Sequence, residues 1–521
     1  MTWPKVDADH LIVTAEEMAS FEDQILSSGF PVEALMEKVG QAMAAWFRQH
    51  AELLENGVIV LIGPGHNGGD GLVVARELYL SGVRVRIWCP FHISKPLNAK
   101  YLAHARWIGI TELKEPPNVG DKALWIDALF GVAQSRSLPE EIAKLLTLRQ
   151  VVNPGGLVSL DIPSGISSDS GISFTGGAAF ASFTLTVGLI KKGLVQDCAI
   201  PHVGRLERID LGFPSHVFEE LAKPLILGVM PSDLETVSWP EIGLTASKYQ
   251  RGRVLVVAGS EKYRGAALLA LKGAIASGAG SIQAALPKGV ADSLWQVSPE
   301  VVLAAAFESS PDEIVLRDFF ETYDLDRVDA LLVGPGLGDR EGNWSLVKEI
   351  LADFDGLLVL DADALNRIAF SDEGWEWIKR RKSSTWITPH IGEFSRLFPT
   401  IKEQSLLDAA IKAAEMSEAS VLLKGAHTVI ADPKGIAWQL LDTAPWVART
   451  GLGDLLAGFV AGVGALAMAS ERGVSTEFLA LAAFVHAEAA HRSTKGSSAN
   501  VIGQSLEAMT KEIQSRHSHY R

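Results

Sequence analysis

The hydrophobic pattern in the first half of the chain predicts short buried strands that alternate with helices. Near-continuous apolar runs are separated by stretches with helical periodicity, which is typical of a parallel sheet covered on both faces. Ahead of them, residues 14–49 have a helical pattern, and Thr14-Ala15-Glu16-Glu17 forms a capping box at its start. The expected strands are residues 57–62, 83–89, 123–126, 157–160 and 181–187, with a helix at 72–80.

The second half repeats this alternation after residues 230–252, a segment with two prolines, several polar residues and weak periodicity. Because 521 residues exceed one ordinary core, we predict an α/β fold with two domains, residues 1–225 and 226–521. The expected strands are 254–258, 281–285, 330–333, 357–360, 385–388 and 421–423, with a hairpin of 428–430 and 436–440. Helices are expected at 266–277, 407–414, 455–469 and 476–492.

Composition and charge narrow the classes of partner. The chain is 47% hydrophobic and 21% charged, with a net charge of −15, which argues against nucleic acid or an anionic membrane as the main partner. Cys89 and Cys198 have neither metal-site nor disulfide spacing, and the N-terminus has no signal-peptide pattern, so we expect a cytoplasmic protein. The apolar run 455–470 is too short to span a bilayer and predicts a buried helix.

Gly63-Pro64-Gly65-His66-Asn67-Gly68-Gly69-Asp70-Gly71 lies between an expected strand and an expected helix. A helix start offers unpaired N–H groups and the positive end of the helix dipole, and glycine lets a phosphate approach the backbone. The residues also fit the GxGxxG dinucleotide pattern, but the next strand ends in Trp88-Cys89-Pro90-Phe91 without the acidic residue that binds ribose. An ordinary NAD-dependent dehydrogenase is therefore disfavoured.

Polar side chains follow several strands of this first sheet. Asp127 and Asp161 end strands, and Ser164 follows shortly after. Singly, each Asp is more often a helix cap or turn residue. Because the carboxyl ends of parallel strands meet at one edge, Asn67, Asp127 and Ser164 are expected to converge. Oxygen donors without His or Cys suit an alkali or alkaline-earth cation.

Four separated motifs carry a family resemblance: Met36-Glu37, Gly63–Gly71, Asp127–Gly131 and Asp161–Gly165. In this order, across residues 10–215, the chain resembles the N-terminal epimerase domain of the NAD(P)H-hydrate repair proteins, a Rossmann-like three-layer αβα domain. The resemblance implies that Asn67, Asp127 and Ser164 hold K+ and that Asp161 is the acid/base residue. It also implies hydrate contacts from His66, Asn67, Gly68, Gly69, Asp70, Gly131, Val132, Ala133, Gln134, Ser135, Arg136, Ser137 and Asp161.

This chain departs from the usual family pattern at the first site. His66 stands where the family usually has Asn, and the loop 131–137 differs from the usual Gly-Thr-Gly-Leu-Asn-Arg-Pro. Arg136 is kept, so a phosphate contact survives.

Gly453-Asp454 starts an apolar helix in the second half and pairs an anion-binding helix end with a carboxylate, as in the ribokinase-like fold. Taken alone, Asp454 is more often a simple helix cap, a lone His390 a structural residue and a lone Lys424 a solvated one. Their neighbours change this interpretation. Further glycine, carboxylate and basic positions follow strands at Gly334–Gly338, Asp361 with Asp363, His390 with Glu393, and Lys424.

Together with Gly259-Ser260, Tyr263 and Gly265-Ala266, these segments resemble the ADP-dependent NAD(P)H-hydrate dehydratase over residues 240–510. The resemblance implies a ribokinase-like α/β domain with Asp454 as catalytic residue. It implies hydrate contacts from Ala266, Gly336, Gly338, His390 and Asp454, and ADP contacts from Lys424, Gly425, Ala426, His427, Thr428 and Gly453. Thr450 and Leu452 depart from the usual Gly-Gly-Thr-Gly-Asp; a Cβ at Thr450 would crowd a phosphate if its φ were positive, and Leu452 lacks a donor hydroxyl.

The whole chain therefore resembles the fused bifunctional enzyme. The resemblance implies epimerisation of the R and S hydrates of NADH and NADPH (NADHX and NADPHX), followed by dehydration of the S hydrate at the expense of ADP. K+ is expected in the first domain, Mg2+ is a further candidate in the second, and we expect a homo-oligomer. The alternatives are a ribokinase-type kinase of a small molecule and a nucleotide-binding protein whose second site has decayed through Thr450 and Leu452.

Overall fold

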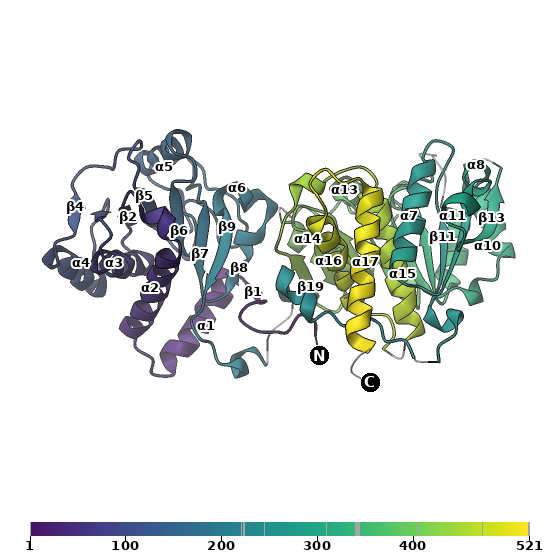
Figure 1. Cartoon of the computed structure of the whole chain (residues 1–521), viewed down its shortest axis with the longest axis horizontal. Coiled ribbons are helices and arrows are strands. Elements are labelled where there is room, and N and C mark those ends of the chain that lie inside the picture. Colours follow the sequence, from purple (N-terminus) through teal and green to yellow (C-terminus); the bar gives the residue numbers. More distant parts are fainter. Residues whose placement is uncertain are drawn as a thin grey trace. The chain divides into compact units, whose positions relative to one another are not determined.

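The computed structural model describes residues 2–219, 221, 224–243, 245–308, 310–338, 344–403, 405–470 and 472–518. The chain forms two compact units, which we call the N-terminal unit (Val6–Leu221) and the C-terminal unit (Met1–Lys5 with Ala222–Arg521). Each unit has a large β-sheet with helices packed against it (Figure 1). The predicted α/β class is confirmed.

The N-terminal unit has a seven-stranded, fully parallel sheet in the order β4-β3-β2-β5-β6-β7-β9. Ile59 and Leu61 face α5 (Glu140–Val152), while Val60 and Ile62 face Gly71 of α3 (His66–Leu80), so helices cover both faces. The strands are β2 (Val58–Ile62), β3 (Val85–Trp88), β4 (Thr111–Leu113), β5 (Leu124–Ala128), β6 (Leu157–Leu160), β7 (Phe183–Val187) and β9 (Arg205–Ile209). The other helices are α4 (Pro96–Trp107) and α6 (Ile200–Val203).

The segment expected to be helical, residues 14–49, forms two helices. They are α1 (Ala15–Ser27) and α2 (Val32–Gln49), and Pro31 is the N-cap of the second. Gly29, at φ 96°, takes the left-handed conformation that ends α1, and proline cannot supply the N–H that a continuing helix needs. The predicted capping box is confirmed, since the Thr14 hydroxyl accepts from Glu17 N and the Glu17 carboxylate accepts from Thr14 N.

The C-terminal unit has a ten-stranded sheet in the order β10-β19-β18-β17-β16-β15-β14-β11-β12-β13. All pairs are parallel except β17–β18 and β18–β19, which form the expected hairpin region. The strands are β10 (Leu225–Val229), β11 (Arg253–Val257), β12 (Ser281–Pro287), β13 (Val302–Phe307), β14 (Ala330–Val333), β15 (Leu357–Leu360), β16 (Thr385–Ile387), β17 (Ser420–Leu423), β18 (Val429–Asp432) and β19 (Ile436–Leu440). β10 and β13 were not predicted.

The helices of this unit include α7 (Arg264–Ala276), which packs closely on α15 (Leu452–Ala469). A Cβ on Gly458 would lie 1.7 Å from the Ala270 carbonyl oxygen, so glycine permits this approach. Among the residues described, α15 is the one helix long and apolar enough to cross a membrane, but 72% of that stretch is buried inside the protein, as predicted for a core helix. The remaining helices are α8 (Lys288–Ala291), α9 (Leu294–Val297), α10 (Glu313–Thr322), α11 (Ser345–Asp353), α12 (Asp363–Ala369), α13 (Ile391–Leu397), α14 (Leu406–Ser417), α16 (Thr476–Arg492) and α17 (Ala499–Ser518).

The first residues of the chain pack into the C-terminal unit. Trp3 is buried, and its ring lies 5.6 Å from that of Phe484. Its carbonyl oxygen accepts from Trp438 Nε1 at 2.7 Å, and its indole N–H donates to Thr236 Oγ1 at 3.2 Å. The C-terminal unit is therefore completed by residues from the far end of the sequence.

Candidate active sites

In the N-terminal unit, the strand order reverses at β2, between β3 and β5, and the first glycine loop follows β2 at this point. Gly63 lies so close to the next loop that a Cβ would be 1.6 Å from the Leu129 carbonyl oxygen. A Cβ on Gly68 would in turn meet the Gly63 carbonyl oxygen at 2.0 Å. Only glycine fits at these two positions. The close packing lets α3 begin at the edge of the sheet where ligands bind in such folds.

The three expected cation ligands lie at this edge. Asp127 is fully buried and accepts from Ser164 N (2.8 Å), Ser164 Oγ (2.7 Å) and Ser159 Oγ (3.0 Å). Asn67 Nδ2 donates to the carbonyl oxygens of Phe130 (2.8 Å) and Leu160 (3.1 Å), so it joins the loop after β5 to the last residue of β6. Asn67 Oδ1 is buried and has no hydrogen-bond partner among the residues described. The fold thus leaves one buried oxygen available beside Asp127 and Ser164.

Asp161 follows β6 with φ 65°, one of three described non-glycine residues with a positive φ. Asp tolerates this conformation better than most residues, and such outliers concentrate at functional sites. The residue is 8% exposed. Its Oδ2 accepts from Val132 N at 3.0 Å, and its Oδ1 accepts from Lys191 Nζ at 2.7 Å. Gly131 is close, since a Cβ there would lie 2.9 Å from Oδ2.

The expected hydrate-contacting loop, residues 131–137, is tied to the same edge. Gln134 Oε1 accepts from Gly165 N at 2.9 Å, and its amide donates to the Arg136 carbonyl oxygen at 3.2 Å. Ala133, Ser135, Arg136, Ser137 and, on α3, His66 are exposed, while Gly68 and Gly69 are buried. Burial, followed by the charges of Asp161 and Glu22, raises the pKa of Asp70 well above its usual value. Asp70 and Asp161 therefore interact electrostatically.

Two residues near this site were missed. Lys191 is buried against Asp161, and Glu22 on α1 interacts with Asp161, which together with burial raises the pKa of Glu22. The available signal for Lys191 was a lysine inside an otherwise apolar run, Leu189-Ile190-Lys191. Nothing in the sequence pattern brings Glu22 to this sheet edge.

In the C-terminal unit, the strand order reverses at β11, between β12 and β14. A Cβ on Gly334 would lie 1.8 Å from the Asp361 carbonyl oxygen, so only glycine fits after β14. Ala362, between Asp361 and Asp363, has φ 49° and ψ −117°, a strained backbone for alanine. Asp363 Oδ2 accepts from Gly338 N at 2.8 Å. The turn 334–338 therefore contacts the backbone of Asp361 and the carboxylate of Asp363.

Lys424 joins three of these strand ends. Its Nζ donates to Asp361 Oδ1 at 2.8 Å, and Thr388 Oγ1 donates to the same oxygen at 2.8 Å. Burial lowers the pKa of Lys424, but the charges of Asp361, Glu393 and Asp454 outweigh it and raise the pKa. The Lys424 side chain is 22% exposed and that of Asp361 only 2%. The sequence did not predict that Lys424 has a carboxylate partner.

His390 caps α13 and is exposed. Its Nδ1 accepts from Gly392 N at 2.9 Å, and Glu393 Oε2 accepts from His390 N at 2.9 Å. Burial raises the pKa of the Glu393 carboxyl to about 7. His486 on α16, which was not predicted, is buried, and burial together with the charge of Lys424 lowers its pKa to about 4.

Asp454 stands in the first turn of α15, whose N-cap is Gly451 at φ 92°. A Cβ on Gly453 would lie 3.5 Å from Lys424 Nζ, so this helix start and Lys424 are neighbours. Burial, and next the charge of Asp361, raise the pKa of Asp454 to about 6. Thr450 is not among the described residues with positive φ, so the crowding considered for its Cβ does not arise.

The other expected ligand contacts fall into two groups. A Cβ on Gly336 would lie 2.7 Å from Ala266 Cβ, which puts Ala266 beside the turn 334–338. In the loop after β17, Gly425 and Ala426 are exposed, His427 is buried, and Thr428 Oγ1 donates to the Gly425 carbonyl oxygen at 3.3 Å. These loop residues directly follow Lys424, whose ion pair with Asp361 connects the loop to the carboxylates.

Comparison with known proteins gives the family. Residues 254–514 match the family model of NAD(P)H-hydrate dehydratase, and residues 32–193 match that of the YjeF-related protein N-terminus. A bifunctional NAD(P)H-hydrate repair enzyme Nnr from Synechocystis is 38% identical over 92% of this chain and 90% of its own length. The chain belongs to the bifunctional NAD(P)H-hydrate repair enzymes. Enzymes of the same name from Gloeobacter violaceus and Thermofilum pendens are 38% and 32% identical over 86% and 88% of this chain, and 88% and 87% of their own lengths.

Solved structures are also similar to parts of this repair enzyme. A ribokinase-like superfamily protein from Enterococcus faecalis is 22% identical over 57% of this chain and 98% of its own, with a TM-score of 0.45. The ADP/ATP-dependent NAD(P)H-hydrate dehydratase from Bacillus subtilis, co-crystallised with ATP/Mg2+, is 25% identical over 55% and 96%, with a TM-score of 0.44. The predicted bifunctional NAD(P)H-hydrate repair enzyme, an isomerase and a lyase in one chain, is confirmed by the family.

Proposed function

We propose that the two carboxylates Asp161 and Asp454 carry the two activities of this repair enzyme, in domains 1–225 and 226–521. Asp161 directly follows β6, and Asp454 lies beside Lys424, which directly follows β17, so each carboxylate is at the carboxyl-end edge of its sheet. Each is also close to a helix that begins after a glycine and can bind phosphate. The observation that carries the proposal is this shared arrangement, with Asp161 held by Val132 N and Lys191 and Asp454 placed next to Lys424.

In the first domain, Asp161 moves a proton at the hydroxyl beside the ring nitrogen of the hydrated nicotinamide. It protonates the hydroxyl, which leaves as water when the ring nitrogen lone pair forms a C=N bond. Water then adds to the other face and returns its proton to Asp161, so the R and S hydrates interconvert without net change. The contacts from α3 (residues 66–70) and the loop 131–137 hold the nucleotide during this exchange.

K+ in this domain is supported by the donor set. Asn67, Asp127 and Ser164 offer only oxygen atoms, and Asn67 Oδ1 is buried without a protein partner among the residues described. A monovalent cation there would pair with the buried Asp127 carboxylate and fix the loops after β5 and β6.

In the second domain, the S-hydrate hydroxyl attacks the terminal phosphoryl group of ADP. The new O–P bond forms as the P–O bond to AMP breaks, and Asp454 accepts the hydroxyl proton. Phosphate then leaves, driven by the ring nitrogen lone pair, and loss of a neighbouring C–H proton restores NADH or NADPH. The sum is hydrate plus ADP giving the reduced nucleotide, AMP and phosphate. Lys424 and Gly453 face the phosphates, Gly425 to Thr428 the nucleoside, and Ala266, Gly336, Gly338 and His390 the hydrate.

Mg2+ fits the oxygen donors of this site, because Asp361 and Asp363 are carboxylates at strand ends. Bound there, it would neutralise charge on the ADP phosphates. Small-molecule substrates follow from the family. That the enzyme is cytoplasmic and homo-oligomeric, and acts on neither nucleic acid nor membrane, remains part of the proposal, and light scattering tests the assembly.

The test is the stoichiometry of the second reaction. Purified S-hydrate with limiting ADP should give one AMP for each reduced nucleotide formed, and Asp454→Asn should abolish both. Phosphorylation of another hydroxylated metabolite without use of the hydrate would favour the kinase alternative. Calorimetry with ADP and AMP tests the other alternative, a protein whose second site has decayed, because such a site binds neither nucleotide.

A further inference from the structure

Lys191 is a buried lysine that the reactions described above do not use. It ends β8 (Ile190–Lys191), a two-residue strand that pairs in parallel with β1 (Ile12–Val13). Its side chain is 1% exposed. Burying an ammonium group is costly unless it is paired and its hydrogen bonds are satisfied.

All three ammonium protons of Lys191 have acceptors inside the protein. Nζ donates to Asp161 Oδ1 at 2.7 Å, to Thr186 Oγ1 at 3.2 Å and to the Val187 carbonyl oxygen. A lysine has three donors and no acceptor, so no proton is left over for a ligand. Lys191 therefore acts on Asp161 rather than on the hydrate.

The two carboxylate oxygens of Asp161 have different partners. Oδ1 is occupied by Lys191 Nζ and by Val187 N at 3.3 Å. Oδ2 faces the loop expected to contact the hydrate, accepting from Val132 N at 3.0 Å and lying 2.9 Å from a Cβ built on Gly131. One oxygen thus points into the protein and the other toward the substrate loop.

The charges around Asp161 come from three further elements. Glu22 on α1 and Asp70 on α3 interact with it as like charges, and Lys191 on β8 is its ion-pair partner. Burial raises the pKa of both Glu22 and Asp70, and the charge of Asp161 adds to each shift, so Lys191 is the cationic partner within a group of three carboxyls.

We propose that Lys191 is a positioning residue of the epimerase, which holds Oδ1 of Asp161 in place so that Oδ2 faces the hydrate and exchanges the proton. This inference rests on the proposed function of Asp161. It extends that function from one carboxylate to an Asp–Lys pair whose lysine never touches the substrate.

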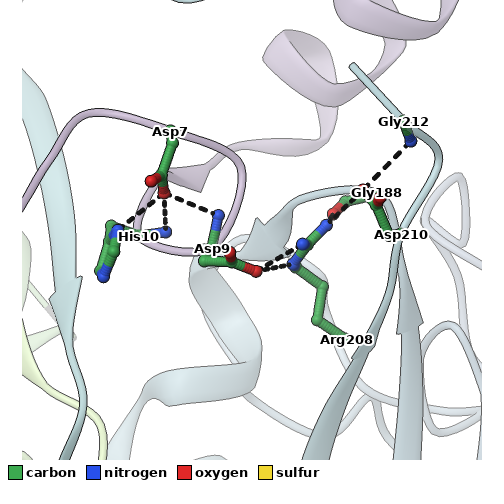
Figure 2. A network of polar contacts seen from close by, with 7 residues as sticks. All are labelled: Asp7, Asp9, His10, Gly188, Arg208, Asp210 and Gly212. Atoms are coloured by element: carbon green, nitrogen blue, oxygen red, sulfur yellow. Dashed lines mark hydrogen bonds and ion pairs between the residues drawn. The ribbon is translucent and has the colours of Figure 1, made fainter. Parts of the chain in front are cut away.

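A polar network holds the segment that carries Lys191 in place (Figure 2). Arg208 on β9 donates to the Gly188 carbonyl oxygen at 3.0 Å, two residues before β8, and to Asp9 Oδ1 at 2.8 Å. Asp7 Oδ1 accepts from His10 Nδ1 at 2.7 Å in the turn that precedes β1. The network thus connects the turn before β1 to the loop before β8, the two strands whose pairing places Lys191.

The experiment compares full-length Lys191→Met with Asp161→Asn and with Lys192→Met, which removes the neighbouring half-buried lysine. Interconversion of separated R and S hydrates is followed by chromatography from acidic to alkaline pH, and NADH formation from S-hydrate and ADP reports the other domain in the same sample. Lys191→Met should lower kcat for interconversion about tenfold or more while KM stays within about threefold, because Asp161 loses its fixed orientation but the expected hydrate contacts of α3 and the loop 131–137 remain. Lys192→Met should match the native enzyme.

The outcomes distinguish a failure of the proposed role of Asp161 from a failure of the role inferred for Lys191. If the native enzyme does not epimerise, or Asp161→Asn is as active as the native enzyme, the proposed function itself fails. If Asp161→Asn is inactive but Lys191→Met keeps the native kcat within about threefold, or changes KM alone, Lys191 does not position Asp161 and the inference is overturned. Should Lys191→Met not fold, Lys191→Arg carries the test. Arginine keeps the charge but cannot place its donors where Nζ lies, so kcat should fall with KM within about threefold, and a native kcat would overturn the inference.

Discussion

The pair formed by Lys424 and Asp361 allows the sharpest prediction about the dehydratase site. Lys424→Met removes the ammonium group and leaves the Asp361 carboxylate, 2% exposed, with only the Thr388 hydroxyl at 2.8 Å among its side-chain partners described here. Removing one partner of a buried ion pair costs about 3–5 kcal/mol, and we expect the lower end, about 3 kcal/mol, because Lys424 is 22% exposed.

This free energy should be visible in calorimetric unfolding of the full chain. About 3 kcal/mol lowers the unfolding temperature of a unit of this size by roughly 5 °C, while the transition of the N-terminal unit serves as internal reference. Lys412→Met is the matched control: its ion pair with Glu403 is as short, at 2.7 Å, but the two side chains are 49% and 28% exposed. An exposed pair of this kind contributes about 0–1 kcal/mol.

A double-mutant cycle separates the stabilising role of Lys424 from its role toward ADP. Asp361→Asn combined with Lys424→Met removes the unpaired charge, so stability should recover by about 2 kcal/mol relative to Lys424→Met alone. ADP binding measured by calorimetry should remain weak in the double mutant, because the phosphate contact is still missing. The reasoning is refuted if Lys424→Met destabilises no more than Lys412→Met, or if the double mutant binds ADP like the native enzyme.

Three further predictions concern pH, potassium and the N-terminal segment. Because Asp454 must be ionised to accept a proton and its pKa is raised to about 6, dehydratase kcat should fall below about pH 6, and Asp361→Asn should move this limb to lower pH; a limb that stays in place contradicts the assignment. Asn67→Ala should raise the K+ concentration for half-maximal epimerase rate about tenfold or more, with tetramethylammonium as ionic-strength control, and an unchanged K+ response would exclude Asn67 as ligand. Trp3→Ala should cost the C-terminal unit about 3–5 kcal/mol in calorimetric unfolding and leave the N-terminal transition unmoved, whereas equal shifts in both would contradict the packing of Trp3.

Strands with strong apolar runs were predictable. Residues 157–160, 330–333 and 357–360 form strands at the expected bounds, because central strands of a parallel sheet are buried on both faces. β13 was missed because its residues are mostly exposed or half-buried and include three alanines, which have low strand propensity. β10 was missed because its pairing with β19 joins segments far apart in the sequence.

Some residues of the candidate sites were likewise predictable from the sequence and others were not. The positions of Asp127, Asp161 and Asp361 followed from strand ends, since parallel strands bring their carboxyl ends to one edge. Lys191 did not, because it depends on the pairing of two very short strands, β1 and β8, which have no periodicity to detect. The ion pair of Lys424 with Asp361 likewise depends on side-chain directions that periodicity does not specify.

The central claim is that Asp161 and Asp454 perform successive steps on one substrate. Its most direct test is the recovery of reduced-nicotinamide absorbance from a known mixture of R and S hydrates with ADP. The native enzyme should restore all of it, Asp161→Asn only the fraction present as S apart from slow uncatalysed exchange, and Asp454→Asn none. Full recovery by either variant, or none by the native enzyme, would contradict the account.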